Sequence, residues 1–114
     1  MNYEDLAVYQ KAVKLAAEVI PYASELRPFR LSEQICACVL SISSNIAEGS
    51  SYSSKKDFNR FLTYAKGSAA ELSSQLLVLK EINPNQEKLE HWKRESEVIQ
   101  RMLHKLKASI ENWQ

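Results

Sequence analysis

Residues 58–79, FNRFLTYAKGSAAELSSQLLVL, carry the pattern that decides the fold class. Their apolar side chains recur at alternating steps of four and three residues, which is the spacing of one continuous helix packed along a partner. The members of this seam are Phe58, Leu62, Ala65, Ala69, Leu72, Leu76 and Leu79. Just before the stretch, Ser54 is followed three residues later by Asp57, a combination that caps the start of a helix. The sequence therefore predicts a long amphipathic helix that opens near Ser54.

Three other segments repeat this spacing. The seam over residues 6–23 consists of Leu6, Tyr9, Val13, Ala16, Ile20 and Ala23. The seam over residues 31–46 consists of Leu31, Ile35, Val39, Ile42 and Ile46. The seam over residues 89–113 consists of Leu89, Trp92, Ser96, Ile99, Leu103, Leu106, Ile110 and Trp113. Pro28 is expected to end the first of these helices, and Gly49 to cap the C-terminal end of the second. Asn83 and Pro84 are expected to stop the third helix and start the fourth.

The composition fits a few long helices joined by few turns. Only two glycines and three prolines occur in 114 residues, and 45% of the residues are hydrophobic against 25% charged. One folded domain over residues 1–114 is therefore expected. Because short connections make consecutive helices antiparallel, the predicted fold class is all-α, an up-down-up-down antiparallel four-helix bundle. An extended helical hairpin that completes its core only in an oligomer is the alternative.

Charge and hydropathy exclude several function classes. Fifteen basic and 14 acidic side chains give a net charge of +1, which is no electrostatic footprint for nucleic acid by itself. The N-terminal residues are acidic and lack an apolar core segment, and no apolar run is long enough to span a membrane, so neither a signal peptide nor a membrane partner is expected. Cys36 and Cys38 point to different sides of a helix and suit reduced thiols. A cytoplasmic location follows as the expectation.

The residue types that carry catalysis and metal binding form no pattern. Helical bundles bind metals through Glu-x-x-His pairs on facing helices, but neither His91 nor His104 has a glutamate three residues before it. Two glycines 18 residues apart cannot form a phosphate-binding loop. We expect no catalytic site, no metal site and no cofactor, in a protein that is not an enzyme. The one foothold for an enzyme is Glu48 or Glu71 as a buried carboxylate beside a cavity.

A band of polar and small residues interrupts the apolar seams of the second and third predicted helices. Its members are Gln34, Ser41, Asn45, Glu48, Gly67, Ser68, Glu71 and Gln75. Two interpretations stay open: a network or subunit contact that fixes helix register, which is the commoner arrangement, or a site for a ligand or nucleic acid. A mid-helix glycine costs about 1 kcal/mol relative to alanine, so Gly67 favours a close helix contact, within the bundle or between subunits.

Four motifs in this order resemble one bacterial family, the proteins encoded in intervening sequences of 23S ribosomal RNA genes. The motifs are DLAVYQKA (residues 5–12), SISSNIAEG (41–49), KDFNRFL (56–62) and AKGSAAEL (65–72). The resemblance implies a four-helix bundle that assembles as a ring-like homopentamer without known catalytic activity. It also implies kinship with the accessory protein of diversity-generating retroelements, a basic pentamer that works with a reverse transcriptase and binds nucleic acid.

Two functional hypotheses follow. The first is a non-enzymatic assembly module that forms a homopentamer and acts through a protein partner. The second is a nucleic-acid-binding accessory protein acting with RNA or a reverse transcriptase, and its candidate contacts are Lys55, Lys56, Arg60 and Lys66. The chain departs from the family pattern at Cys36, Ala37 and Tyr52, where basic residues are usual. The absence of these three cations lowers the expected affinity for phosphates, so the assembly module is the leading hypothesis.

Overall fold

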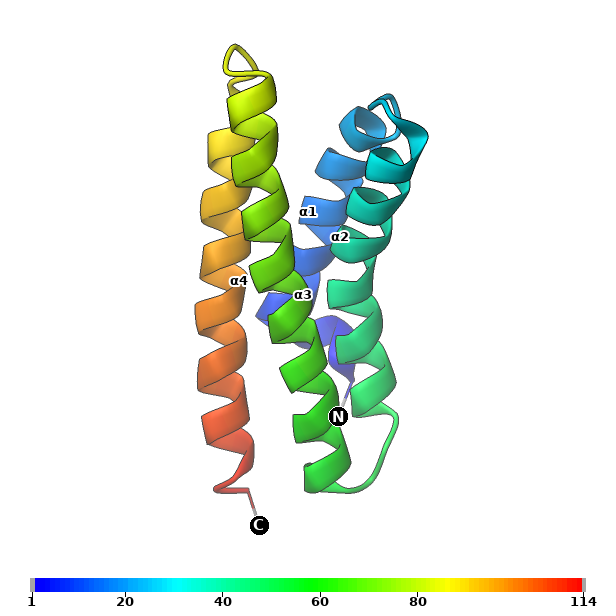
Figure 1. Cartoon of the computed structure of the whole chain (residues 1–114). Helices are drawn as coiled ribbons and strands as arrows, with labels where there is room; N and C mark the ends of the chain where they lie inside the picture. Colours follow the sequence, from blue (N-terminus) through cyan, green and yellow to red (C-terminus); the bar gives the residue numbers. More distant parts are fainter. Residues whose placement is uncertain (1, 114) are drawn as a thin grey trace.

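The computed structural model describes residues 2–113 of the chain (Figure 1). A short 3-10 turn, η1 (Tyr3–Asp5), precedes four α-helices: α1 (Ala7–Ala23), α2 (Phe29–Ser50), α3 (Lys55–Ile82) and α4 (Lys88–Ile110). No strand occurs among residues 2–113, so the expected all-α fold class is confirmed. None of the helices described is both long and apolar enough to cross a membrane.

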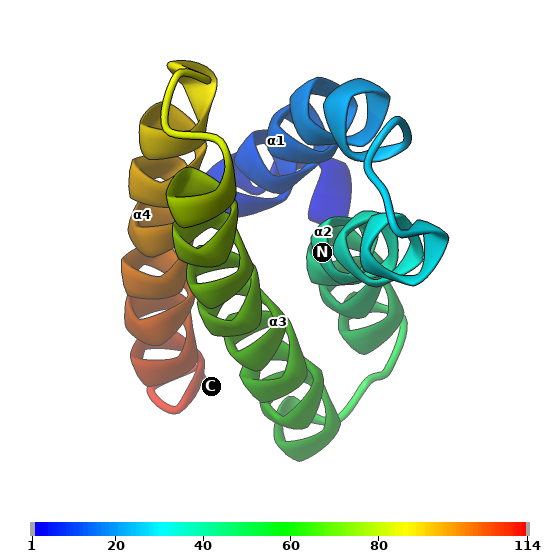
Figure 2. The same ribbon diagram turned by 45° about the horizontal axis from the view of Figure 1, so that its top comes forward.

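The helices run alternately up and down, in the expected order of an antiparallel four-helix bundle (Figure 1). The molecule is elongated, with extents of 49 × 21 × 19 Å. Helix α3 packs along both α2 and α4, whereas α1 and α4 share few contacts. The α1–α2 hairpin and the α3–α4 hairpin therefore diverge toward the end that holds their two connections (Figures 1 and 2).

The predicted seams of α2, α3 and α4 face the core, but the seam predicted for α1 does so only in part, at Ala16 and Ala23. The buried residues of α1 are Val8, Ala12, Leu15, Ala16, Val19 and Ala23. Of the predicted seam, Tyr9 and Ile20 are only partly buried and Val13 is 41% exposed. The reason is that α1 carries two apolar stripes side by side, and helical spacing alone does not say which one the core takes.

Three predicted helix ends are wrong. Helix α1 stops at Ala23, five residues before Pro28, and Pro28 instead stands just before the first residue of α2, where its fixed φ is suited to a helix start. Gly49 does not cap α2, which continues through it to Ser50, and no glycine among the described residues has a positive φ. Asn83 ends α3, but α4 begins only at Lys88, because residues 83–86 form a turn.

The two glycines differ sharply in their surroundings. A Cβ atom added at Gly49 would lie 2.6 Å from the Cβ of Phe61 and 3.2 Å from Cδ1 of Phe58, so the glycine lets α2 approach the start of α3. A Cβ atom added at Gly67 would meet nothing within 4 Å. Gly67 therefore makes no close contact with another helix of the described chain (residues 2–113), contrary to the contact expected within the bundle. Gly49 makes such a contact instead.

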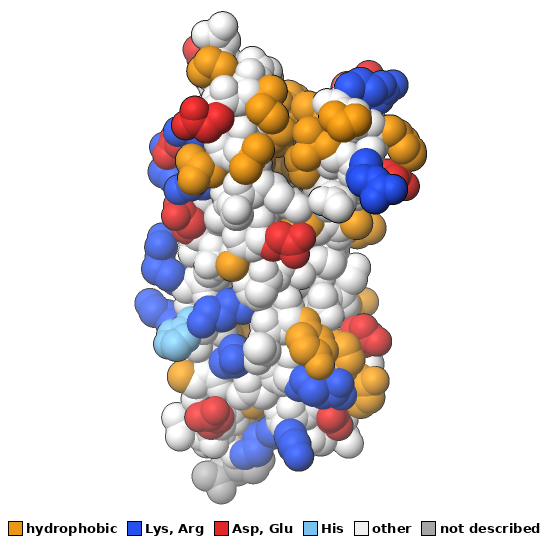
Figure 3. All heavy atoms as spheres, viewed as in Figure 1, with side chains coloured by type: hydrophobic (Ala, Val, Ile, Leu, Met, Phe, Trp, Pro, Cys, Tyr) orange, Lys and Arg blue, Asp and Glu red, His pale blue; other side chains and the backbone are white. Residues whose placement is uncertain are grey.

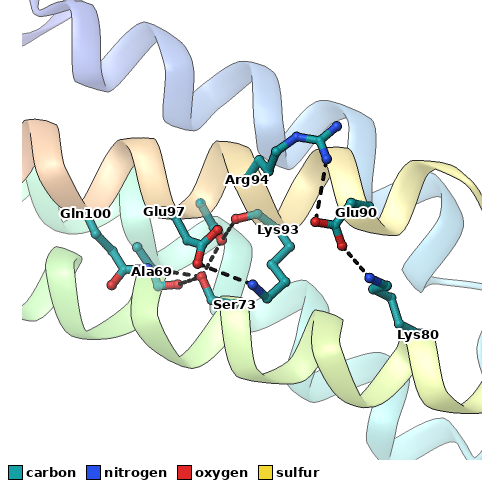
Figure 4. A network of polar contacts seen from close by, with 9 residues as sticks. Ala69, Ser73, Lys80, Glu90, Lys93, Arg94, Glu97 and Gln100 are labelled. Carbon is teal, nitrogen blue, oxygen red and sulfur yellow. Dashed lines mark hydrogen bonds and ion pairs between the residues drawn. The ribbon is translucent and has the colours of Figure 1, made fainter.

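A polar seam joins α3 to α4 (Figure 4). The hydroxyls of Ser73 and Ser96 are hydrogen-bonded to each other, and Nε2 of Gln100 donates to Oγ of Ser73 at 3.0 Å. Toward the α3–α4 connection, Lys80 pairs with Glu90, whose other carboxylate oxygen lies 3.5 Å from a guanidinium nitrogen of Arg94. Because Ser96 is fully buried and satisfied here, this seam fixes the register of α3 against α4.

Candidate functional site

The second apolar stripe of α1 lines a groove on the outside of the bundle. The groove has a volume of about 440 Å³ and lies between α1 and α2; its lining residues are Tyr9, Val13, Ala16, Ala17, Ile20, Leu40, Ser43, Ser44 and Ala47. None of them is charged. Val13 and Leu40 are 41% and 52% exposed. The small side chains along the groove leave room for another helix to approach closely.

The eight residues of the predicted polar band lie along α2 and α3, and none of them is buried. Their side-chain hydrogen bonds stay within one helix: Nδ2 of Asn45 donates to the carbonyl oxygen of Ser41 at 2.8 Å, and Nε2 of Gln75 donates to the Glu71 carboxylate at 3.4 Å. Within the described chain, no side-chain hydrogen bond joins a band residue of α2 to one of α3. The polar network that crosses between helices is the Ser73, Ser96 and Gln100 seam, of which the sequence indicated only Ser96.

The two glutamates of the band are exposed, so neither is the buried carboxylate that an active site there would need. Near Glu71, the thiol of Cys38 donates to the carbonyl oxygen of Ser68 at 3.2 Å. Burial, together with the nearby charge of Glu71, raises the pKa of this thiol to about 12. The thiol therefore stays protonated at neutral pH and is a poor nucleophile.

The structure places the four predicted basic contacts in two hollows between α3 and α4. Lys55, Lys56 and Arg60 line one of about 470 Å³, near the N-terminal end of α3. Lys66 lines the other, of about 410 Å³, with Arg101, His104 and Lys105 of α4. Nζ of Lys66 is 3.2 Å from Nδ1 of His104. Helix α4 thus adds Arg101 and Lys105, which the sequence pattern did not indicate.

Charge is segregated along the α3–α4 hairpin. The end of the hairpin opposite its connection, residues 55–66 and 101–113, is called the open end here; it holds seven basic and two acidic side chains, a net charge of +5. The rest of the hairpin, residues 67–100, holds four basic and six acidic side chains, a net charge of −2. The net charge of the whole chain, +1, does not reveal that one end of this hairpin is basic. Basic side chains gather in the lower half of the face in Figure 3, beside hydrophobic ones.

Within residues 2–113, no group of three or more His, Cys, Asp or Glu side chains could hold a metal ion. The two histidines lie exposed on α4, and His104 has a lysine rather than a carboxylate as its neighbour. Two surface features stand out as candidate contact sites: the uncharged groove between α1 and α2, and the basic end of the α3–α4 hairpin.

Comparison with known proteins agrees with the bundle. The family model of the 23S rRNA-intervening sequence protein matches residues 4–105. The chain belongs to this family. The match includes α1, α2, α3 and most of α4, so the 23S rRNA-intervening sequence protein family accounts for the whole bundle and not for one hairpin.

A solved structure supports the same fold. It is a crystal structure of a protein of unknown function from the S23 ribosomal protein family of Bacteroides thetaiotaomicron. Its TM-score is 0.82 at 25% sequence identity, and the alignment covers 89% of this chain and 98% of that one. No curated protein matches the chain. Membership of the 23S rRNA-intervening sequence protein family therefore establishes kinship and fold.

Proposed function

We propose that this 23S rRNA-intervening sequence protein is a non-enzymatic module that self-associates through the groove between α1 and α2. The observation that carries the proposal is the second apolar stripe of α1, which helical spacing marks as a packing seam and which the monomer leaves partly exposed, most of all at Val13. Soluble monomers scatter single apolar residues over the surface, but a continuous uncharged groove marks a contact site.

The two most exposed aliphatic side chains of the groove set the energy scale. Burying an aliphatic side chain completely contributes about 1.5–3 kcal/mol, and Val13 and Leu40 each have about half of that burial still to gain. Each contact between copies would thus gain about 2 kcal/mol from these two residues. A closed ring of five copies, the stoichiometry implied by the family resemblance, would repeat the contact at every subunit boundary.

Multi-angle light scattering and sedimentation on the purified chain test this proposal. The wild type is expected to be an oligomer at micromolar concentration, and Val13→Lys together with Leu40→Lys is expected to give folded monomers. The matched control is Leu77→Lys together with Val78→Lys, at residues of α3 that are 49% and 52% exposed but lie outside the groove. A monomeric wild type, or a control variant as disruptive as the groove variant, would contradict the proposal.

A second candidate function is nucleic-acid binding at the open end of the α3–α4 hairpin, favoured by its net charge of +5. Each cation that neutralises a phosphate contributes about 0.7–0.9 to the slope of log K against log salt concentration. Lys56→Gln with Arg60→Gln should therefore lower the slope by about 1.4–1.8. Lys14→Gln with Lys88→Gln, which removes the same charge from exposed residues elsewhere, should leave the slope unchanged. Absence of binding at low salt would remove this candidate.

A further inference from the structure

A cluster of aromatic side chains adjoins the basic end of the α3–α4 hairpin. Tyr52, in the α2–α3 connection, stacks on Phe61 with ring centroids 5.3 Å apart and an interplanar angle of 12°. Tyr64 meets Phe61 edge-on at 5.5 Å. Phe61 is buried, whereas Tyr52 and Tyr64 are 44% and 48% exposed. The buried ring thus supports two exposed ones.

Arg60 connects this cluster to the basic hollow. Its guanidinium carbon lies 4.7 Å from the Phe61 ring centroid and 6.0 Å from that of Tyr64, while the same side chain lines the hollow together with Lys55 and Lys56. Lys56, Arg60 and Tyr64 follow one another at four-residue steps, so they share one face of α3. Two cations and an exposed ring therefore lie within about 12 Å along the helix.

We propose that this surface binds single-stranded nucleic acid, with phosphates on Lys55, Lys56 and Arg60 and bases stacked on Tyr52 and Tyr64. The inference rests on the nucleic-acid candidate proposed above and adds which form is bound. Cations that follow the backbone beside aromatic rings that accept bases are the combination used by single-strand binders. In a duplex the base faces are occupied by neighbouring pairs, so the rings would have nothing to stack on.

The arrangement of the rings also favours binding over a purely structural role. One face of the Tyr52 ring packs on Phe61, and this contact alone would be structural. About half of the surface of Tyr52 nevertheless stays in water. Because Phe61 and Arg60 already hold the two tyrosines in place, little side-chain freedom would be lost on stacking. Asp57 pairs with Arg60 at 3.2 Å, and this exposed ion pair is weak enough to be replaced by a phosphate contact.

Fluorescence anisotropy with labelled oligothymidylate, oligouridylate and a duplex of equal length tests the inference on the full chain. Tyr52→Ala and Tyr64→Ala are each expected to weaken single-strand binding about 5- to 150-fold, the equivalent of about 1–3 kcal/mol per stacked base. Their salt slope should stay that of the wild type, because no cation is lost. Tyr52→Phe and Tyr64→Phe keep the ring and should bind as the wild type does. Phe29→Ala removes an exposed ring from the N-terminal end of α2 and is the control.

The outcomes distinguish single-strand binding with stacked bases from nucleic-acid binding by the cations alone. Loss of binding in the alanine variants, with recovery in the phenylalanine variants and a preference for single strands, supports the inference. Equal binding of duplex and single strand, unaffected by the alanine variants but weakened by Lys56→Gln with Arg60→Gln, overturns the inference and leaves a purely electrostatic site. No binding of any oligonucleotide at about 50 mM salt removes both. The two oligonucleotides decide between RNA and DNA as the preferred strand.

Discussion

Alanine substitution at the two glycines should change the stability of the fold in opposite directions. Both glycines are helical, so helix propensity alone predicts that either substitution stabilises the chain by about 1 kcal/mol. At Gly67 a Cβ atom meets nothing within 4 Å, and this gain should appear in full. For a domain of this size it should raise the midpoint of thermal unfolding by about 4 °C.

At Gly49 there is no room for a Cβ atom. The new Cβ atom would lie 2.6 Å from the Cβ of Phe61, about 1 Å short of a comfortable carbon–carbon contact. Since the Cβ of Phe61 is fixed to the α3 backbone, relief requires moving α3 rather than turning a side chain. Overpacking of a close contact costs about 1–3 kcal/mol, and we expect the upper end, so the net effect is a loss of about 2 kcal/mol after the gain in propensity.

Urea unfolding followed by far-UV circular dichroism measures both effects. Carrying the substitutions in the Val13→Lys, Leu40→Lys background keeps the contribution of any oligomer out of the measurement. The two alanine variants should then differ by about 3 kcal/mol. Stabilisation by Gly49→Ala would refute the packing argument. A Gly67→Ala variant that is stabilised in the groove-substituted background but destabilised in the wild-type background would place Gly67 in a contact between copies.

Three further predictions concern single side chains. Ser96→Ala should cost about 1 kcal/mol in urea unfolding, because it removes a fully buried hydroxyl that bonds both helices of the α3–α4 seam. Glu95→Gln should destabilise the chain at neutral pH but not in strong acid: the hydrogen bond from Lys11 lowers the pKa of the Glu95 carboxyl, so the folded state binds fewer protons and this stability is lost as the pH falls through the lowered pKa. Unfolding curves of variant and wild type that stay parallel at every pH would contradict this. Thiol labelling at pH about 8 should modify Cys36 in the native chain and Cys38 only after unfolding, since burial protects Cys38 and raises its pKa to about 12; equal labelling rates would contradict the burial argument.

The sequence predicted the central helices better than the outer one. The seam of α3 is buried at every predicted residue, because this helix packs along both α2 and α4. Helix α1 packs mainly on α2 and carries two stripes, so the pattern was consistent with two orientations. The sequence predicts a helix end at Gly49 because glycine often occupies that position, but only the structure shows the Phe61 side chain that requires a glycine there.

The candidate surfaces were predicted in part. Lys55, Lys56, Arg60 and Lys66 were identified from α3, but their partners on α4 are more than 30 residues away in sequence and could be found only through the antiparallel pairing. A count of charge by hairpin end would have indicated the basic end, which the total of +1 conceals. The sequence marks Tyr52 only as a position without the usual cation, because its stacking on Phe61 depends on how the α2–α3 connection folds back.

Because the packing between α1 and α4 is sparse, α1 is expected to have a lower local stability than α3. Three side-chain contacts between described residues join α1 to α4. Nε1 of Trp92 donates to the Glu18 carboxylate at 3.1 Å, Lys11 pairs with Glu95 at 2.7 Å, and the ring centroids of Tyr22 and Trp92 lie 5.5 Å apart. Regions with few buried contacts open first in native-state hydrogen exchange, so the amides of α1 should exchange before those of α3. A second copy seated in the α1–α2 groove would hold α1 closed, and its exchange would then slow as protein concentration rises. The helix that opens most readily in one copy would thus report whether another is bound.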